Sequence, residues 1–275
     1  MASRHPVLTA AEVWRTYDDV EQRLTAPVSE RMLDLAGLQP GMRVLDLATG
    51  RGEPAVRAAR RVGPSGVVVG IDLSEDMLQM ARDRAASEGV SNLDLRVGSA
   101  ESPEGLPPAY FHAVLARWCL MYFDAPMVAL VAARRSLVPG GVLVAAVWAE
   151  PERVPYYTLP RRVLERYRTF PAIDPEAPGT FHYADVTRLH RDFAAAGLTI
   201  GHVEEVEIPV MEARTGAELV AWTRAFGLTR LLNDLPEAHQ RAWERDLVRE
   251  VEPLRRDGIV RLGGVTRIVV ATPVG

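Results

Sequence analysis

The chain has 275 residues, of which 48% are hydrophobic and 25% are charged, and its net charge is −4. This balance suits one large globular domain or a core with a cap, and no basic field indicates a nucleic-acid partner. The one cysteine, Cys119, excludes an intrachain disulfide. No apolar run approaches the roughly 20 residues of a membrane span and no apolar signal core opens the chain, so we expect a cytoplasmic protein without a membrane partner.

The first half of the chain alternates strand-like and helix-like stretches. Two helices are expected at its start, over 9–24 with Thr9 as N-cap and over 28–38 with Gly37 closing it. Strand-like runs rich in valine or leucine follow at 43–47, 66–72, 93–98, 111–117 and 141–148. The helices between them are expected to begin at Pro54, Ser74 and Asp124. This alternation predicts an α/β fold with a Rossmann-like, doubly wound parallel sheet.

The second half departs from this rhythm after Trp148. A stretch dense in proline and aromatic residues predicts a cap around one helix, over about 156–168. A helix over 185–196 and a strand-like run over 198–210 return to the core, and two helices over 215–258 precede a final strand that is at an edge or antiparallel. In chain order we expect an N-terminal helical lid (1–40), a central core (41–148), a cap insertion (149–184), a continuation of the core (185–211), a helical cap (212–258) and a final core strand (259–275).

The first strand runs into a glycine-rich turn, "VLDLATGRGEPA" (44–55), with the spacing Gly50-x-Gly52-x-x-Ala55. Glycines let the backbone approach a ligand closely, and the N-terminus of the following helix offers free N–H groups. Asp72 ends the second strand twenty residues after Gly52, where a carboxylate can accept hydrogen bonds from both hydroxyls of a ribose. A dinucleotide and S-adenosylmethionine (SAM) both fit this pattern.

Asp46 distinguishes between these two ligands. A carboxylate at the end of the first strand would repel a pyrophosphate, whereas SAM has no phosphate and carries a sulfonium and an ammonium group. Dinucleotide sites also more often place the first glycine directly after an apolar strand, and here the residues from Asp46 to Thr49 come before Gly50. The sequence therefore favours SAM.

Four segments resemble the class I SAM-dependent methyltransferases, of the sort grouped with the ubiquinone/menaquinone-biosynthesis C-methyltransferases. They are "RVLDLATGRGEPA", "VVVGIDLSEDMLQMAR", "VLARWCLMYFDAP" and "RRSLVPGGVLVAAVW". The resemblance covers residues 35–150 and extends loosely to both ends. It implies a seven-stranded sheet in the order 3-2-1-4-5-7-6 with strand 7 antiparallel, with SAM as the cofactor and S-adenosylhomocysteine as the product.

The resemblance also implies roles for residues at matching positions. The resemblance implies that Asp72 binds the ribose of SAM. A second contact with the cofactor is expected after the fourth strand, at Arg117 and Trp118. Trp118 is expected to pack rather than react. The methionine moiety of SAM goes to the glycine turn, here Asp46, Ala48, Gly50 and Gly52.

The adenine is expected between Leu73 and Met77, for which core packing is the alternative. After the third strand the family often has an acid that faces the adenine amine. This chain departs from that pattern with Ser99, followed by Ala100, so the contact passes to Ser99 or to a backbone group. His112 is rejected as a base because it begins the fourth strand, whereas ligands collect at the carboxyl ends of parallel strands.

Methyl transfer from a sulfonium is an in-line displacement, so the protein chiefly holds the nucleophile and the methyl group in line. A side-chain base is needed only for an acceptor that arrives protonated. The candidates are His182, in the loop after the proline-rich stretch, and Tyr17, in the helical lid; a surface loop and helix packing are their alternative roles. No metal-ligand spacing is apparent, so no metal site is expected.

The remaining marked residues have structural explanations beside functional ones. The aromatic residues of the insertion could line an apolar pocket or join the cap to the core: Tyr156, Tyr157, Phe170 and Phe181. Trp222 and Phe226 are expected to pack within the helical cap. The basic run of Arg161, Arg162, Arg166 and Arg168 is expected to be a solvated helix face, with a phosphate-bearing substrate or a partner surface as the second interpretation. Cys119 is expected to be buried and inert.

The predicted function is SAM-dependent methyl transfer to a small apolar or aromatic molecule in secondary or quinone-type metabolism, with oxygen favoured over carbon or nitrogen. One alternative is an NAD-dependent oxidoreductase on a Rossmann sheet, which Asp46 disfavours. Another is a protein with the methyltransferase fold whose SAM is structural, or which serves as a binding partner. The sequence is also compatible with a homodimer, because the cap helices could pair with a second subunit as easily as cover a pocket.

Overall fold

The computed structural model describes residues 7–102, 105–170, 174 and 176–274. The first six residues of the predicted N-terminal lid, and residues 171–173 and 175 of the predicted insertion, lie outside the described residues. None of the helices in the described part of the chain combines the length and the apolar character that crossing a bilayer requires.

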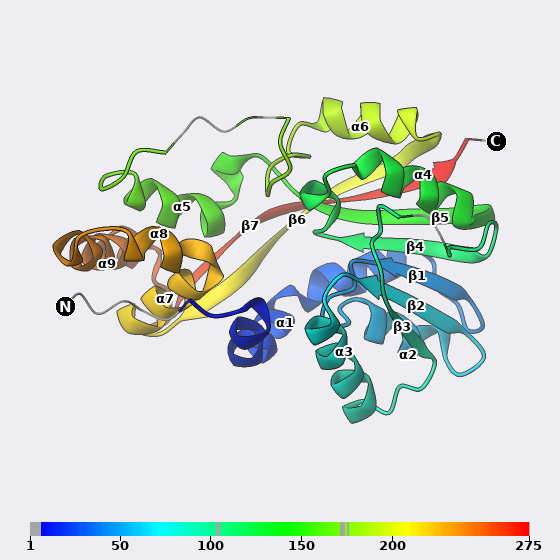
Figure 1. The fold of residues 1–275 in the computed structure, drawn as a ribbon, viewed down its shortest axis with the longest axis horizontal. Coiled ribbons are helices and arrows are strands. Elements are labelled where there is room, and N and C mark those ends of the chain that lie inside the picture. The colour runs from blue at the N-terminus through cyan, green and yellow to red at the C-terminus, as the bar shows by residue number, and fades with distance from the viewer. Residues whose placement is uncertain (1–6, 103–104, 171–173, 175, 275) are drawn as a thin grey trace. The chain divides into compact units, whose positions relative to one another are not determined.

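Among the described residues, seven strands form one sheet in the order β3-β2-β1-β4-β5-β7-β6 (Figure 1). β1 pairs in parallel with β2 and β4, β2 with β3, and β4 with β5, whereas β7 is antiparallel to β5. The predicted order and the antiparallel final strand are confirmed; that strand is not at the edge, because β6 lies outside it. The bounds are β1 Arg43–Leu47, β2 Val67–Asp72, β3 Leu93–Val97, β4 Phe111–Arg117, β5 Leu137–Trp148, β6 Leu198–Ala213 and β7 Val260–Pro273.

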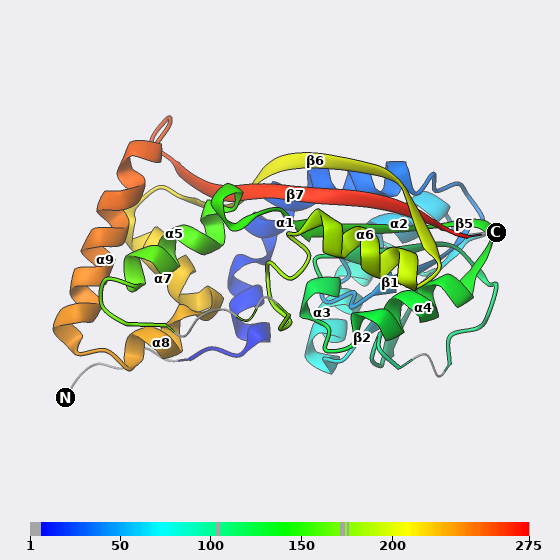
Figure 2. The same cartoon turned by 90° about the horizontal axis from the view of Figure 1, so that it is seen from above.

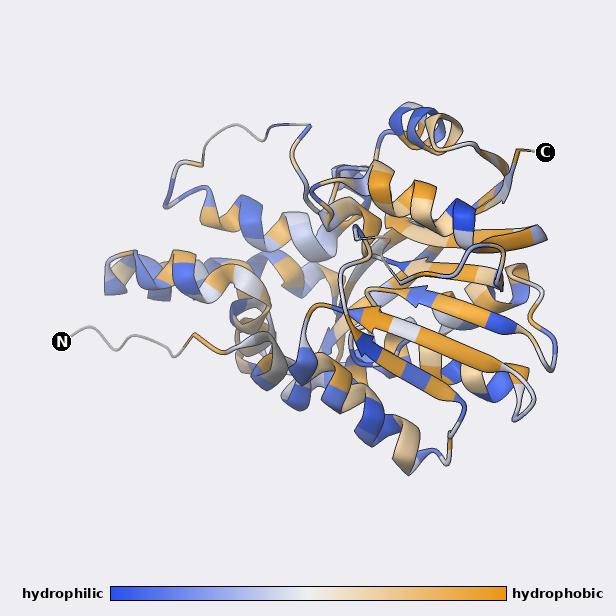
Figure 3. Ribbon diagram, turned by 45° about the vertical axis from the view of Figure 1, so that its right-hand side comes forward, coloured by the Kyte–Doolittle hydropathy of each residue, from blue (hydrophilic) through white to orange (hydrophobic). Residues whose placement is uncertain are grey.

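The central strands are buried because they carry apolar side chains toward both faces. Val44, Leu45 and Leu47 of β1 are at most 1% exposed, as are Val114 and Leu115 of β4. Figure 3 shows long hydrophobic runs along the strands, while the helices alternate hydrophobic and hydrophilic stretches. This distribution is the one expected for a parallel sheet that helices cover. β6 and β7 run side by side at the other end of the sheet (Figure 2).

The helices that follow the strands begin close to the predicted positions. Ser74 is the N-cap of α3 and its hydroxyl accepts a hydrogen bond from the Met77 amide at 3.3 Å. Pro54 is the N-cap of α2 rather than its first residue, and α4 begins at Pro126 instead of Asp124. The helices are α1 Ala10–Leu35, α2 Ala55–Val62, α3 Glu75–Ser87, α4 Pro126–Ser136, α5 Pro155–Leu164, α6 Val186–Ala195, α7 Gly216–Thr223, α8 Thr229–Asn233 and α9 Glu237–Val251.

α1 is one helix where the sequence predicted two. Pro27 lies inside it, and a proline in a helix interior removes a backbone hydrogen bond. Leu24, Val28 and Met32 recur at helical spacing on one buried face, and this burial offsets the loss. Thr9 caps the helix as predicted, since its hydroxyl accepts a hydrogen bond from the Glu12 amide at 3.3 Å.

Residues 215–258, all of them described, form three α-helices rather than the predicted two. A wide turn over Arg224–Leu228 separates α7 from α8, and Gly227 in it has a φ of 104°, which glycine adopts readily. α9 follows after Pro236. The sequence pattern missed this break because apolar residues continue at helical spacing through it.

The chain forms two compact units, which we describe separately. The sheet unit holds the described residues within Ala26–Glu150, Pro175–Val206 and Val265–Gly275. The helical unit holds the described residues within Met1–Thr25, Pro151–Asp174 and Glu207–Gly264. α1, β6 and β7 contribute residues to both units. The finer division into six segments stays a prediction.

Arg267 is a buried charge in the sheet unit. Its guanidinium donates to a carboxylate oxygen of Glu205 at 3.0 Å, to the carbonyl oxygen of Ala184 at 2.5 Å and to a carboxylate oxygen of Glu150. The Arg267 side chain is 4% exposed, so these acceptors replace the water that it loses. The Arg267 side chain on β7 thereby connects three segments: the residues just after β5, the loop that precedes α6, and the strand β6.

The basic run of the helical unit is not simply solvated. Arg162 on α5 and Arg166 in the turn after it both bind the carboxylate of Glu250 on α9, at 3.1 and 2.8 Å. Tyr167 donates to Asp246 of the same helix at 2.7 Å. The side chains of Arg162 and Arg166 stay 63% and 45% exposed, so the face is solvated as predicted, and it also pairs with acids about 80 residues later in the chain.

Candidate functional site

The glycine turn follows β1 in a conformation that glycine favours. Gly50 has a φ of 55° and Gly52 a φ of 84°, and Ala48 adopts a φ of 49° although it is not a glycine. A Cβ atom on Gly52 would come within 2.9 Å of Val56 Cγ2 and 3.1 Å of Ala81 Cβ. Gly52 therefore allows the turn to pass closely between α2 and α3, and larger residues are excluded there.

Asp46 lies just before this turn and is 1% exposed. Its Oδ2 accepts a hydrogen bond from the Thr49 hydroxyl at 2.6 Å, whereas its Oδ1 has no hydrogen-bond partner among the described residues. Burial raises the pKa of this carboxyl to about 7, although Thr49 and Arg117 act in the opposite direction. A buried acceptor without a partner is costly, so this atom is suited to a cationic ligand group.

Asp72 holds the glycine turn to the end of β2. Its Oδ2 accepts from the Gly50 amide at 2.8 Å, and its Oδ1 accepts from the Ser74 amide at 2.9 Å. A carboxylate can accept about four hydrogen bonds, so both oxygens can still accept from ribose hydroxyls. This carboxylate shapes the turn itself, a role that the sequence did not indicate.

The residues predicted for the adenine lie at the ends of β2 and β3. Asp72 pairs with Val97, which brings the segments after both strands to the same edge of the sheet. Leu73 is 73% exposed, and Met77 is half-buried at the start of α3. The Ser99 hydroxyl accepts from the Glu101 amide at 3.1 Å, and Ala100 is buried. Leu73 is therefore accessible to a ligand, whereas the Ser99 hydroxyl already stabilises the turn in which it lies.

Arg117 ends β4 and Trp118 follows it, beside the glycine turn. Because Asp46 pairs with Leu115, Arg117 lies two residues further along β4 than the partner of Asp46, and its charge favours the ionised Asp46 carboxyl. The Arg117 guanidinium lies 4.7 Å from the centre of the Trp118 ring and is 3.4 Å from the Ser29 hydroxyl on α1. Trp118 packs on Trp148, as its predicted packing role requires.

The two candidate bases lie in different units. In the sheet unit, Nδ1 of His182 is 3.2 Å from the carbonyl oxygen of Ala177. The Gly179 amide donates to the Met121 carbonyl at 2.8 Å, which places the loop of His182 against the segment after β4. In the helical unit, Tyr17 packs on Trp222 with ring centroids 4.6 Å apart, and burial raises the pKa of its phenol.

Other residues occupy positions with clear chemical consequences. His112 accepts from the Arg43 amide at 3.0 Å at the amino end of β4, consistent with its rejection as a base. Sequence reasoning missed Thr49, whose position three residues after Asp46 was the available signal, and Glu53, which is buried directly after Gly52. Within the described ranges no group of three or more His, Cys, Asp or Glu side chains could hold a metal ion.

Comparisons with known proteins identify the family of the chain. Residues 38–160 match the family described as "Methyltransferase domain". The chain is 33% identical over 238 residues to Nocamycin O-methyltransferase of Saccharothrix syringae, a match that covers 82% of this chain and 83% of that protein. It is 35% identical over 120 residues to Ubiquinone/menaquinone biosynthesis C-methyltransferase UbiE of Pseudomonas entomophila (strain L48), covering 43% of this chain and 46% of that protein.

Solved structures share the fold at lower identity. A crystal structure of a SAM-dependent methyltransferase from Aquifex aeolicus superposes with a TM-score of 0.54 at 21% identity. The match covers 72% of this chain and 93% of that one. At this level of identity the likeness bears on the fold alone.

Proposed function

Since the chain belongs to the class I SAM-dependent methyltransferases, we propose that it methylates an oxygen atom of a small apolar or aromatic molecule. The observation that carries the cofactor site is the buried Asp46, with one carboxylate oxygen lacking a partner among the described residues. The preference for oxygen is supported by the relative that matches 82% of this chain, which is named as an O-methyltransferase.

The fit to SAM follows from the charges at the sheet edge. The methionine tail of SAM carries an ammonium and a carboxylate, and Asp46 and Arg117 offer the complementary charges beside the glycine turn. The free lone pairs of Asp72 suit the ribose hydroxyls, and the accessible Leu73 suits the adenine ring. Met77, Ser99 and Ala100 are proposed to complete the adenine surface.

SAM supplies an electrophilic methyl group when it is bound. The residues of the chain have to orient it and to remove a proton if the acceptor is a hydroxyl. We assign the removal of that proton to His182, acting as a base. A proton on Nδ1 would satisfy the Ala177 carbonyl and leave Nε2 as the acceptor, and the loop lies against the segment after β4. Tyr17 is the second candidate for the same role.

The helical unit contains aromatic side chains that pack on one another. Tyr17 and Trp222 pack closely, and Phe226 stacks on Trp222 with centroids 5.0 Å apart. Trp222 also donates through Nε1 to the Tyr156 hydroxyl at 3.1 Å. This packing is the structural role that the sequence leads us to expect for Trp222 and Phe226.

Binding and turnover test this proposal in sequence. Calorimetry with SAM and with S-adenosylhomocysteine should show saturable binding of both, whereas a thermal shift with NAD(H) and none with either would favour the oxidoreductase. A mass-shift screen of phenols, enols and carboxylic acids with SAM should then yield products heavier by one methyl group. Tight SAM binding without turnover of any acceptor would favour a structural role for SAM.

Substitution of His182 tests the assignment of the base. With an acceptor in hand, His182→Ala should lower kcat/KM, and His190→Ala, at an exposed histidine on α6, should leave it unchanged. An unchanged kcat/KM in His182→Ala would limit this residue to a structural role. Sedimentation of the full chain would decide whether a homodimer forms.

A further inference from the structure

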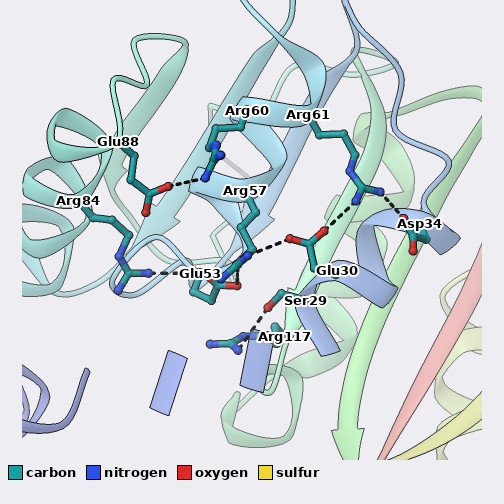
Figure 4. A network of polar contacts seen from close by, with 10 residues as sticks. All are labelled: Ser29, Glu30, Asp34, Glu53, Arg57, Arg60, Arg61, Arg84, Glu88 and Arg117. Carbon is teal, nitrogen blue, oxygen red and sulfur yellow. Dashed lines mark hydrogen bonds and ion pairs between the residues drawn. The ribbon is translucent and has the colours of Figure 1, made fainter. Parts of the chain in front are cut away.

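One acidic side chain is buried at the end of the glycine turn. Glu53 follows Gly52, and its side chain is 3% exposed. Its Oε1 accepts from Nε of Arg57 at 2.8 Å, and its Oε2 lies 3.6 Å from Nη1 of Arg84 (Figure 4). A buried carboxylate is costly without charged partners, so these two arginines are what keeps Glu53 in place.

The contacts continue from Glu53 to α1. Arg57 also donates through Nη1 to Oε1 of Glu30 at 2.9 Å, and Oε2 of Glu30 accepts from Arg61 at 2.8 Å. Figure 4 shows these side chains as one connected group, with Arg57 and Arg61 on α2, Arg84 on α3 and Glu30 on α1. All of them belong to the sheet unit. The last residue of the glycine turn is thereby fixed to three helices.

Glu53 also influences Asp46 through its charge. Asp46 is faced by Thr49 and Glu53 from the glycine turn, by Asp72 from the end of β2, and by Arg117 and the Cys119 thiol from the end of β4. Glu53 and Asp72 disfavour the ionised Asp46 carboxyl, whereas Arg117 favours it. The same acid therefore acts on the shape of the turn and on the protonation of its neighbour.

We propose that Glu53 is a positioning residue for SAM, which holds the glycine turn through Arg57 and Arg84 and adds negative electrostatic potential near Asp46. This inference rests on the proposed placement of the SAM ammonium group at Asp46. Glu53 itself does not touch the ligand in this account. Its effect on SAM passes through the backbone of the turn and through the electrostatic potential at Asp46.

The test is calorimetric titration of the full chain with SAM from pH 5.5 to 7.5, with each variant compared with the wild type at the same pH, so that any loss of the proton of the SAM α-amino group is common to both. In Glu53→Gln the affinity should fall about tenfold, because the amide oxygen can still accept from Arg57 but the negative charge that pairs with Arg57 and Arg84 is lost. The midpoint of its pH dependence should also move to lower pH, because one negative charge near Asp46 is gone. A purely structural loss would lower the affinity and leave that midpoint in place.

Glu88→Gln is the matched control, since Glu88 pairs with Arg60 at 3.1 Å between the same two helices but is 33% exposed. It should bind SAM like the wild type. Glu53→Asp keeps the charge on a shorter side chain, so the midpoint of its pH dependence should match the wild type while its affinity for SAM falls severalfold. If Glu53→Gln does not fold, the proposal is tested with Glu53→Asp instead.

The proposal would be overturned by wild-type affinity in both Glu53 variants or by an unmoved midpoint in Glu53→Gln. An equal loss in Glu88→Gln would do the same, since it would mean that any pair between α2 and α3 has this effect. Failure of the wild type to bind SAM at every pH would instead refute the proposed cofactor site.

Discussion

The indole of Trp118 stacks on that of Trp148, with ring centroids 4.7 Å apart and planes 8° from parallel. Trp118 has a φ of 52°, which is unusual for a bulky residue and marks a position that its surroundings hold. Its Nε1 donates to the Thr266 hydroxyl at 2.8 Å, and that hydroxyl donates to the Val147 carbonyl at 2.9 Å. The segment after β4 is thus tied to β5 and β7.

Trp118→Ala should lower the free energy of unfolding of the sheet unit by about 2–3 kcal/mol, because a half-buried indole and its stacking partner lose contact. Trp118→Phe keeps a ring on Trp148 and loses only the Nε1 hydrogen bond, so about 1 kcal/mol is expected. Thermal unfolding followed by near-UV circular dichroism compares the two. Equal losses would mean that the hydrogen bond, and not the stack, holds the segment.

Asp46 should make the SAM-free protein less stable as pH rises. The folded pKa, about 7, lies above the ordinary value of 3.8, so the folded state binds the proton more tightly than the unfolded state. The contribution of this group to stability is therefore present below about pH 4 and is lost as pH rises to 7. Asp46→Asn should be more stable than the wild type at pH 8, while its SAM affinity falls about 30-fold or more.

Melting temperatures from pH 5 to 8, without and with SAM, measure this trade-off. The wild type should show the steeper decline without SAM and the larger rise on adding it. A pH dependence that is the same in wild type and Asp46→Asn would show that another group dominates.

Asp72→Ala should abolish measurable SAM binding, because it removes the acceptor for both the Gly50 and Ser74 amides as well as the proposed ribose contact. Asp76→Ala is the control: Asp76 is exposed in the first turn of α3, and its loss should cost only about 0.5 kcal/mol through the helix dipole. Calorimetry and thermal unfolding separate affinity from stability. SAM binding by Asp72→Ala at near wild-type affinity would exclude Asp72 from the site.

Arg267→Met should lower the free energy of unfolding by about 2–3 kcal/mol, since it removes a buried guanidinium that donates to two carboxylates and a carbonyl oxygen. The value is below that of a fully buried pair because Glu150 and Glu205 are 42% and 38% exposed. Arg261→Met, at an exposed arginine 3.5 Å from Glu212, should cost about 0.5 kcal/mol or less. Similar losses in both would contradict the central role of Arg267.

The fold was predictable because its signals are local. The valine-rich runs that became β2 and β5, the Ser74 cap and the Gly50–Gly52 spacing each report on a few neighbouring residues. α1 was predicted as two helices because Pro27 is a local breaker, whereas the burial that keeps the helix continuous is tertiary.

The candidate site was predictable only in part for the same reason. Asp46, Gly52 and Asp72 were indicated by spacing along one βαβ unit. The pairing of Arg162 with Glu250 and the contact of Trp118 with Thr266 join residues 88 and 148 positions apart, and no local pattern encodes such partners. Glu53 had a local signal, its position four residues before Arg57, but its burial could not be read from that spacing.

Cys119, the one cysteine of the chain, follows β4 and contacts the end of β1, just before the glycine turn. Its thiol donates to the Leu47 carbonyl at 3.4 Å and is buried, and burial raises its pKa, so a thiol reagent meets it only when this part of the sheet unit opens. The natural sequence thus contains a single-site reporter. Thiol labelling followed by mass spectrometry would count openings of the end of β1, and slower labelling with SAM would measure how far the ligand suppresses them.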